Sequence, residues 1–224
     1  MNPRSEARPT AMTKDQAIQK LHDARLYAIL DTGYSNPADW PRLTRELISG
    51  GVGALQIRAK HSANDEIAAW AREILAISAP AGVPLIINDH PEITVSVGAN
   101  GCHVGQDDFS VAETRKTVGD GIFIGKSTHS LEQAIAAQQE GADYIGFGPI
   151  FSTPTKPDYR PIGAQDIREM AEKIQIPHFC IGGIKKENVP ALKSQGARRV
   201  VIVSGLLQND NPCAYAQKVC RILA

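Results

Sequence analysis

The sequence predicts an α/β fold, a single (β/α)8 TIM barrel, because eight short apolar runs alternate with segments of helical spacing. Alternating polar residues do not break these runs, which is typical of parallel strands that are buried on both faces. A chain of 224 residues is long enough for eight strand–helix units in one domain. The predicted strands are residues 26–30, 54–57, 84–87, 101–104, 122–124, 144–147, 178–181 and 199–203.

A doubly wound open sheet is the alternative, since the alternation of strands and helices does not reveal whether a sheet closes. A dinucleotide-binding sheet of that kind carries the motif GxGxxG after its first strand. The residues that follow the first predicted strand here read DTGYSNP, without that motif. We therefore favour the closed barrel.

Two of the predicted helices show their apolar spacing clearly, at residues 67–77 and 131–138. Ser62 and Asp65 have the spacing of a capping box at the start of the first of these helices. Glycines in a left-handed conformation are expected to end the helices ahead of three strands. These glycines are Gly82, Gly141 and Gly196.

The domain boundaries follow from the same pattern. Residues 1–15 are polar, have no core pattern and lack the apolar segment of a signal peptide. We expect them to form a short, poorly ordered N-terminal extension. Residues 16–224 contain no linker or shift of composition and are expected to form the single barrel domain.

The overall charge is zero, with 24 basic and 24 acidic residues. A neutral chain argues against a protein that binds nucleic acid or anionic membranes, because both functions need a positive excess. No apolar run approaches the ~20 residues of a membrane span, and the four cysteines show no paired spacing. We expect a reduced, cytoplasmic protein whose partners are small molecules.

Polar residues gather where the predicted strands end, and active sites of barrels lie at the carboxyl ends of their strands. Gln56, Arg58 and Lys60 alternate along the end of the second strand, so they share one face. Two cations and an amide on one face favour an anion, which Arg58 would grip through two oxygens. The alternative is a solvated strand end with weak surface ion pairs, but these residues directly follow an apolar strand.

Two carboxylates follow consecutive predicted strands. Asp89 ends the third strand beside Asn88, and Asp108 follows the fourth. Carboxylates that converge in this way suit Mg²⁺, which takes one or two of them together with water and phosphate oxygens. The alternative role of an Asp after a strand is to cap the next helix.

Two small-residue turns follow the last two strands and fit the usual phosphate cradle of a barrel. Gly182 and Gly183 follow the seventh strand, and Ser204 and Gly205 follow the eighth. Glycines let backbone N–H groups approach an anion closely. The sequence therefore predicts two anions, one at each side of the barrel mouth.

A long segment without a core pattern, residues 149–163, precedes the seventh strand. Long loops of this kind usually serve function. Thr153, Thr155 and Lys156 lie on it and are placed to reach inward between the two predicted anions.

The chain resembles the thiamine-phosphate synthase family in the segments QIRAK, IINDH, GCHVGQDD, GKSTHS, GADYIGFGPIFSTPTK, IGGI and VVIVSG. The resemblance runs from about residue 26 to residue 224. Members of this family are transferases of thiamine biosynthesis. They join 4-amino-2-methyl-5-hydroxymethylpyrimidine diphosphate to a thiazole phosphate, which yields thiamine phosphate and diphosphate. The resemblance implies the same barrel fold, the same activity and a requirement for Mg²⁺.

The resemblance also implies a role for individual residues. The pyrimidine diphosphate would be held by Tyr27, Gln56, Arg58, Lys60, Asn88, Ser127 and Lys156. The thiazole phosphate would be held by Thr153, Thr155, Gly183, Val203 and Ser204. Mg²⁺ would be bound by Asp89 and Asp108, and the catalytic residues would be Arg58, Lys60, Ser127 and Lys156. One departure from the family is Lys126, a cation whose direction the sequence leaves open.

The implied chemistry suits the residues. Diphosphate leaves a benzylic-type carbon of an electron-rich ring, so catalysis consists mainly of neutralising the leaving group and holding the thiazole nearby. The thiazole nitrogen attacks with its own lone pair, and no general base is needed. His103 and His129 are accordingly interpreted as hydrogen-bonding residues at strand ends.

Three alternatives share parts of this pattern. A thiazole tautomerase would use the same phosphate cradle but would need neither a metal nor cations for diphosphate. A sugar-phosphate isomerase or epimerase would need a pair of carboxylates or histidines around a carbon acid. A non-catalytic regulator would bind phosphate without releasing diphosphate. The sequence does not indicate the oligomeric state or whether the thiazole is carboxylated.

Overall fold

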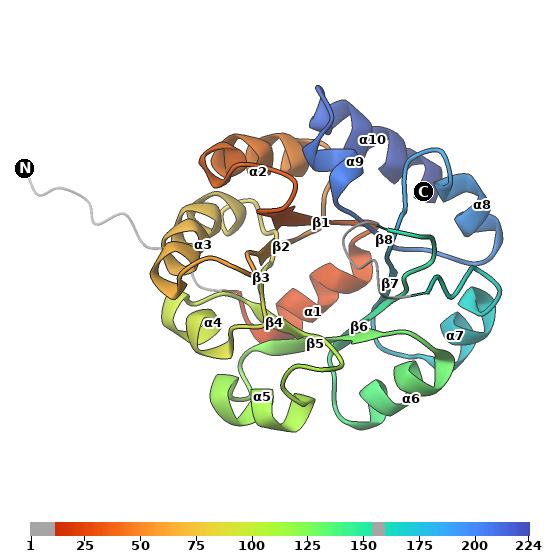
Figure 1. The fold of residues 1–224 in the computed structure, drawn as a ribbon, viewed down its shortest axis with the longest axis horizontal. Helices are drawn as coiled ribbons and strands as arrows, with labels where there is room; N and C mark the ends of the chain where they lie inside the picture. Colours follow the sequence, from red (N-terminus) through yellow and green to blue (C-terminus); the bar gives the residue numbers. More distant parts are fainter. Residues whose placement is uncertain (1–11, 154–159) are drawn as a thin grey trace, which may run out of the picture.

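The structure is a computed structural model, and it describes residues 12–153 and 160–224. Parallel strands close into a barrel in chain order, and β8 pairs with β1 (Figure 1). The strands are β1 (Leu26–Asp31), β2 (Ala54–Arg58), β3 (Leu85–Asn88), β4 (Gly101–Val104), β5 (Phe123–Thr128), β6 (Tyr144–Phe147), β7 (His178–Cys180) and β8 (Val200–Ile202). The predicted barrel is confirmed, and the alternative of an open sheet is wrong.

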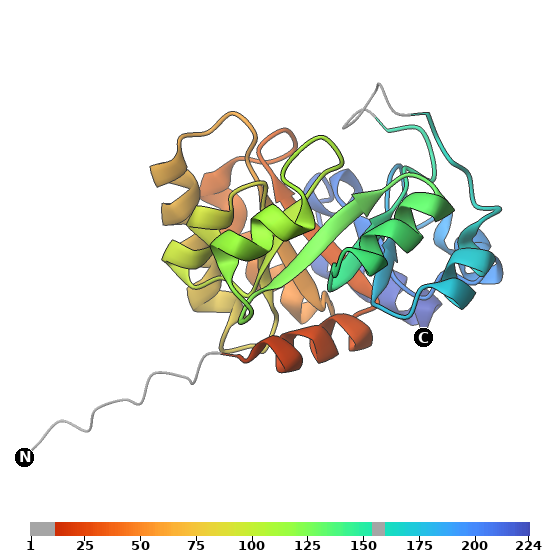
Figure 2. The ribbon, with the colours of Figure 1, turned by 90° about the horizontal axis from the view of Figure 1, so that it is seen from below.

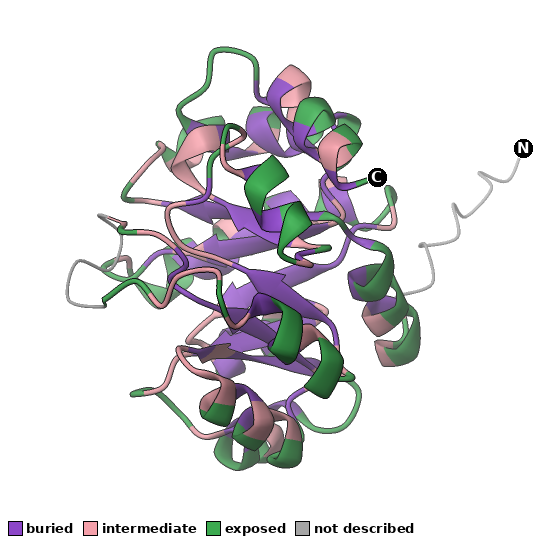
Figure 3. Cartoon of the chain, turned by 90° about the vertical axis from the view of Figure 1, so that its right-hand side faces the viewer, coloured by how far each residue is buried: buried purple, intermediate pink, exposed green. Residues whose placement is uncertain are grey.

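Helices surround the barrel (Figure 1). They are α2 (Trp40–Ser49), α3 (Asn64–Ser78), α4 (Pro91–Val97), α5 (Val111–Val118), α6 (Leu131–Gln139), α7 (Ile167–Lys173), α8 (Val189–Ser194), α9 (Ser204–Leu207) and α10 (Pro212–Leu223), with a 3-10 turn, η1 (Pro37–Asp39), before α2. The strands are buried almost throughout, whereas most helices bury one side and expose the other (Figure 3). The main core therefore lies between the sheet and the ring of helices.

A further helix, α1 (Lys14–Asp23), lies across the amino-terminal ends of the strands (Figure 2). Its buried Ala17 and Leu21 pack against the side chains that fill the lower half of the barrel. Thr13 caps it, because the Thr13 hydroxyl accepts from the Gln16 N–H while the Gln16 side chain accepts from the Thr13 N–H. The helix begins inside the predicted extension, so the expected boundary after residue 15 is wrong. The expected poor order of residues 1–11 lies outside the described residues.

Both ends of α1 are tied to the barrel. Lys14 Nζ lies 2.8 Å from Asp143 Oδ1, and Arg115 Nη2 lies 2.6 Å from the other oxygen of that carboxylate. At the other end, the Arg199 guanidinium donates to the His22 carbonyl at 2.9 and 3.1 Å. The helix is thus a fixed floor of the barrel.

One predicted cap is displaced. The helix after β2 starts one residue later than Ser62 would place it, because Ala63 is the capping position and its N–H donates to Glu66 Oε2 at 3.0 Å. Glu66 is the third residue after Ala63, which is the position from which a side chain reaches back to the capping N–H. The partner is therefore Glu66 and not Asp65.

The predicted left-handed glycines are confirmed, with φ of 67°, 86° and 102° at Gly82, Gly141 and Gly196. Gly141 and Gly196 directly follow the capping residues at the ends of α6 and α8, whereas Gly82 lies in the turn beyond α3, which ends at Ser78.

All four cysteines are free thiols. Over residues 12–153 and 160–224, every helix is too short or too polar to cross a membrane.

The floor role of α1 predicts a large effect of Leu21→Ala. Leu21 is fully buried, and truncating a buried leucine to alanine usually costs about 2–5 kcal/mol of unfolding free energy. Urea denaturation should show a loss in that range. Lys20→Ala, on the exposed side of the same helix, should change the free energy by less than about 0.5 kcal/mol. Equal effects of the two substitutions would mean that α1 does not close the barrel.

Candidate active site

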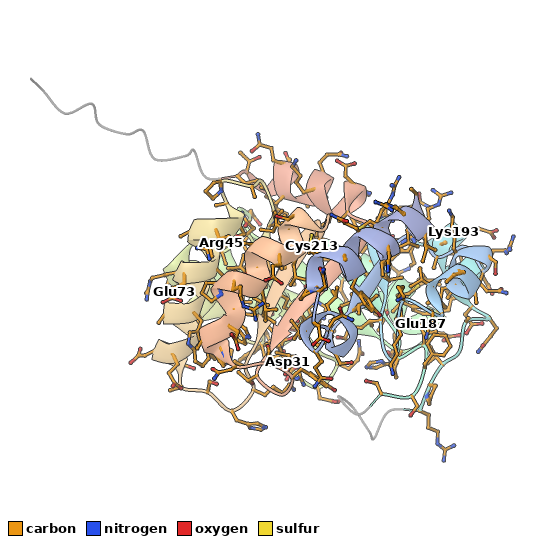
Figure 4. The ribbon with its side chains drawn as sticks, turned by 90° about the horizontal axis from the view of Figure 1, so that it is seen from above. Asp31, Arg45, Glu73, Glu187, Lys193 and Cys213 are labelled. Carbon is orange, nitrogen blue, oxygen red and sulfur yellow. The ribbon has the colours of Figure 1, made fainter. Side chains whose placement is uncertain are left out.

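A cavity of about 240 Å³ opens at the carboxyl ends of the strands. Asp31, one of its lining residues, lies at the end of the barrel opposite α1 (Figure 4). The predicted residues that line it are Gln56, Arg58, Asn88, Ser127, Thr153, Gly183, Val203 and Ser204. Residues from both predicted anion sites therefore share one cavity.

The other predicted residues fall into three groups. Tyr27 is 2% exposed and lies below the cavity instead of lining it. Lys60 and Asp89 stand beside the lining residue Asn88, and Asp108 interacts with Asp89 while it lines the neighbouring cavity between α5 and α6. Thr155 and Lys156 lie outside the described residues.

Arg58 is held by an ion pair that the sequence analysis did not identify. Its Nη1 lies 2.6 Å from Asp31 Oδ2 at the end of the neighbouring strand. The other oxygen of Asp31 accepts from the Gly33 N–H at 2.8 Å, which fixes the carboxylate. Because Asp31 is 2% exposed, its charge depends on Arg58 as partner. Arg58 therefore enters the cavity in one orientation.

Lys60 lies beyond the end of β2 and is the more exposed cation of this strand end. Its Nζ is 3.7 Å from Asp89 Oδ2, and 43% of its side chain is exposed. Asn88 donates to the same Asp89 oxygen at 2.5 Å. Residues from the ends of β2 and β3 thus meet, as the sequence analysis expected.

The two carboxylates after β3 and β4 also meet. Burial raises the pKa of Asp89 above its ordinary value, and repulsion from Asp108 raises it further. Asp108 accepts from the Gly105 N–H at 2.9 Å. Neither carboxylate caps a helix, since the caps of α4 and α5 are His90 and Ser110. The capping alternative is therefore wrong.

The backbone at Asp89 is strained. Its φ is 63°, in the left-handed region that residues other than glycine seldom adopt. The Asp89 N–H donates to the His103 carbonyl at 2.9 Å, so β4 holds it there. Strain of this kind is common at functional sites.

The donor set of this corner fits Mg²⁺. Two carboxylates lie near the cationic side chains of Lys60 and Arg58, and an ion that takes its other ligands from water and phosphate suits such a place. Within residues 12–153 and 160–224 no group of three or more His, Cys, Asp or Glu side chains converges. A closed zinc-type cage is therefore not formed there.

A chain of hydrogen bonds runs through the barrel beneath the cavity. Gln56 donates to the Tyr27 hydroxyl at 2.7 Å, which lies 3.1 Å from the Tyr144 hydroxyl. The Tyr144 hydroxyl contacts His103 Nδ1 at 2.8 Å, and His103 Nε2 contacts Ser127 Oγ at 3.0 Å. Burial raises the pKa of both tyrosines, so their hydroxyls stay neutral. The chain positions Gln56 and Ser127, and His103 is confirmed as a hydrogen-bonding residue.

The glycine pair after β7 brings a second chain segment close. Gly183 has φ of 62°, and a Cβ built on it would lie 2.6 Å from the Ser152 carbonyl oxygen. The Phe151 N–H donates to the Gly182 carbonyl at 3.0 Å. Ser204, at the start of α9, completes this side of the cavity. The predicted cradle is thus bounded by the segment that carries Thr153.

Lys185 is a polar lining residue that the sequence analysis did not identify. Lys185 follows the glycine pair and lines the same side of the cavity. A cation two residues after the glycine pair was the available signal in the sequence. His129 also lines the cavity, and its Nδ1 is within hydrogen-bond distance of the Gly148 carbonyl.

Lys126 has a definite direction in the structure. It is 6% exposed and lines a separate cavity between α5 and α6, with Glu113 and Gln133. Ser127, its neighbour on β5, lines the main cavity. Lys126 therefore lies on the outer face of the barrel and not beside Arg58.

Comparison with known proteins agrees with this geometry. Residues 26–206 match the model of a family described as thiamine monophosphate synthase. The chain is 41% identical over 194 residues to a thiamine-phosphate synthase of Shouchella clausii (strain KSM-K16), covering 86% of this chain and 93% of that protein. It is 37% identical over 204 residues to the thiamine-phosphate synthase of Chloroflexus aurantiacus (strain ATCC 29366 / DSM 635 / J-10-fl), covering 91% and 94%.

A solved structure is similar over nearly the whole chain. Thiamine phosphate pyrophosphorylase from Pyrococcus furiosus superposes with a TM-score of 0.83 at 26% identity, covering 91% of this chain and 96% of that one. The fold, the cavity and the matched sequence lead to one conclusion. The chain belongs to the thiamine monophosphate synthase family, whose members condense a pyrimidine and a thiazole moiety into thiamine phosphate.

Proposed function

We propose that this chain transfers the 4-amino-2-methyl-5-hydroxymethylpyrimidine group from its diphosphate to the nitrogen of a thiazole phosphate, with release of diphosphate and dependence on Mg²⁺. The observation that carries the proposal is the pairing of two anion-binding ends in one cavity. Arg58 and Asn88 line one side, and Gly183, Lys185 and Ser204 line the other.

The leaving diphosphate is assigned to the side of Arg58. Arg58 offers a guanidinium that Asp31 orients, and Lys60 adds a second, more exposed charge. Asp89 and Asp108 would hold Mg²⁺, which supplies further positive charge to the leaving group when it is bound. Ser127 would donate a hydrogen bond from a hydroxyl that His103 orients.

The rings are assigned to the apolar part of the cavity. Ile29, Ile181 and Val201 line it between the two polar sides. An apolar wall binds a heteroaromatic ring and keeps water from the cation that forms as diphosphate leaves. The residues therefore act mainly by holding the thiazole nitrogen near the reacting carbon.

The tautomerase alternative is the natural competitor, because it would use the same glycine cradle. It has no use for two converging carboxylates beside an oriented arginine. An assay of diphosphate release with both substrates separates the two activities, since a tautomerase releases none.

The metal assignment predicts opposite effects of Asp89→Asn on activity and on stability. We expect kcat/KM to fall by more than about 100-fold, since a metal clamp contributes several kcal/mol and ~1.4 kcal/mol is tenfold. Asp108→Asn should behave alike. Diphosphate release measured against Mg²⁺ concentration tests this.

The stability part follows from the raised pKa of Asp89. When the folded pKa exceeds the unfolded one, stability is fully present below the unfolded pKa and is lost as the pH rises through the folded pKa. Without metal at pH 7, Asp89→Asn should therefore unfold at equal or higher urea concentration than the wild type, and Mg²⁺ with diphosphate should no longer stabilise it. A variant that is less stable but still responds to Mg²⁺ would contradict the assignment.

The Asp31–Arg58 pair predicts that Asp31→Asn impairs the pyrimidine side alone. We expect kcat/KM for the pyrimidine diphosphate to fall about tenfold or more, because Arg58 loses its orientation. KM for the thiazole phosphate should stay the same. In a chain that already carries Arg58→Gln, adding Asp31→Asn should reduce the activity no further. Additive effects of the two substitutions would show that Asp31 acts independently of Arg58.

The glycine cradle predicts that Gly183→Ala weakens binding of the thiazole phosphate. A Cβ there would approach the Ser152 carbonyl at 2.6 Å, so the segment at the cavity edge must move. KM for the thiazole phosphate should rise about tenfold, since the backbone groups of the cradle would be displaced from the phosphate, with little change for the pyrimidine diphosphate. Gly98→Ala is the matched control, because Gly98 also has a positive φ but would bring its Cβ near no atom. The reverse pattern of KM values would mean that the two sides of the cavity are exchanged.

A further inference from the structure

A second cavity, of about 550 Å³, lies at the amino-terminal end of the barrel. It is bounded by the ends of α7 and α8 and by the residues that lead into β7 and β8. Lys193, one of its lining residues, lies toward the end of the barrel where α1 crosses, away from Asp31 (Figure 4). The cavity is therefore separate from the candidate active site.

Positive charge is concentrated in this cavity. Its basic lining residues are Arg168, Lys193, Arg198 and Arg199, and among the described lining residues Glu172 is the one acid. The chain as a whole is neutral. Such a concentration is therefore a local feature and not a reflection of composition.

Asp23 offsets part of the charge of Arg199 from a distance, but direct ion pairs do not neutralise these cations. Within residues 12–153 and 160–224, none of the four forms an ion pair. Arg199 donates to the His22 carbonyl, and Arg168 donates to the Ser194 carbonyl at 3.4 Å. These carbonyls satisfy hydrogen bonds but leave the positive charge in place. Burial and the charge of Arg198 lower the pKa of Arg199, so an added anion would relieve its environment.

The remaining lining suits a phosphorylated ligand. His22 and His178 add ring nitrogens, and burial lowers the pKa of His178 to about 4, so that it is a neutral donor or acceptor at pH 7. Ile174 and Ile176 form an apolar wall. Guanidinium groups bind phosphate through two parallel hydrogen bonds. The four basic side chains carry more positive charge than one phosphate group, with a charge of about −2 at pH 7, would neutralise.

We infer that this cavity binds a small anion with two or more linked phosphates, of the inorganic polyphosphate or nucleoside polyphosphate class. Arg168 and Arg198 contact the phosphates, and Lys193 adds charge at the edge. Arg199 contributes charge while it holds α1. The site does not depend on the proposed reaction, which takes place at the opposite ends of the same strands.

Calorimetry with inorganic tripolyphosphate, at low ionic strength and without Mg²⁺, tests this inference. Arg168→Gln/Arg198→Gln should weaken binding at least tenfold. Arg45→Gln/Arg72→Gln removes the same charge from exposed positions on α2 and α3 and should leave binding unchanged. Arg58→Gln should remove only the binding of tripolyphosphate at the candidate active site and should leave the binding that depends on Arg168 and Arg198 unchanged. Arg199 is not replaced, because its loss would release α1.

Further measurements keep the outcomes separate. Both double variants should keep the thermal midpoint and the basal activity of the wild type. Tighter binding of ATP than of tripolyphosphate would assign the site to nucleotides, and equal binding to inorganic polyphosphate. Equal affinity for orthophosphate and tripolyphosphate would overturn the polyphosphate class. Loss in Arg58→Gln of the binding that depends on Arg168 and Arg198, or no loss in Arg168→Gln/Arg198→Gln, would overturn the site itself.

Discussion

The packing of four aromatic rings inside the barrel is the constraint on which the rest of the structure depends. Tyr27, Phe123, Tyr144 and Phe179 fill its lower half, and α1 covers them from below. Their rings fit because small residues face them: a Cβ on Gly125 would lie 2.1 Å from the Tyr144 ring, and one on Gly101 equally close to the Phe123 ring. Inside the barrel, the packed lower half leaves the space above it for the active-site cavity. The two phenol groups then hold Gln56 and, through His103, Ser127 at its floor.

The charged side of the cavity combines a pair of opposite charges, which attract, with a pair of carboxylates, which repel. Arg58 and Asp31 neutralise each other at 2.6 Å and are rigid. Asp89 and Asp108 repel each other, and the charges of Lys60, at 3.7 Å from Asp89, and of Arg58 offset only part of that repulsion. The left-handed backbone of Asp89 adds to the cost. A folded protein tolerates such a corner where a ligand relieves it, which is why stability and function are expected to diverge there.

Much of the fold and the site could be predicted because they follow from two simple regularities of the sequence. The alternation of strands and helices predicted the barrel, and the rule that strand ends converge brought together Arg58, Asn88 and Ser127. The same alternation of faces, applied to Ser127, would have turned Lys126 outward. The sequence does not indicate how far along the barrel axis a strand residue lies. Tyr27 lies below the cavity and Asp31 at its edge, although both belong to the first strand. Helix α1 was not predicted because its segment is mostly polar. It buries only Ala17 and Leu21, which gives little apolar pattern.

The distribution of charge in this neutral chain supports the two anion sites proposed at opposite ends of the barrel. The lining cations of the carboxyl end, Arg58 and Lys185, and those of the amino end, Arg168 and Arg198, are separated by the apolar interior of the barrel. Charges interact weakly beyond the Debye length of about 8 Å at physiological ionic strength. The two proposed sites are therefore expected to attract anions independently of one another. The strands β7 and β8 run from one cavity to the other, so the structural connection between the two ends is the packed barrel itself.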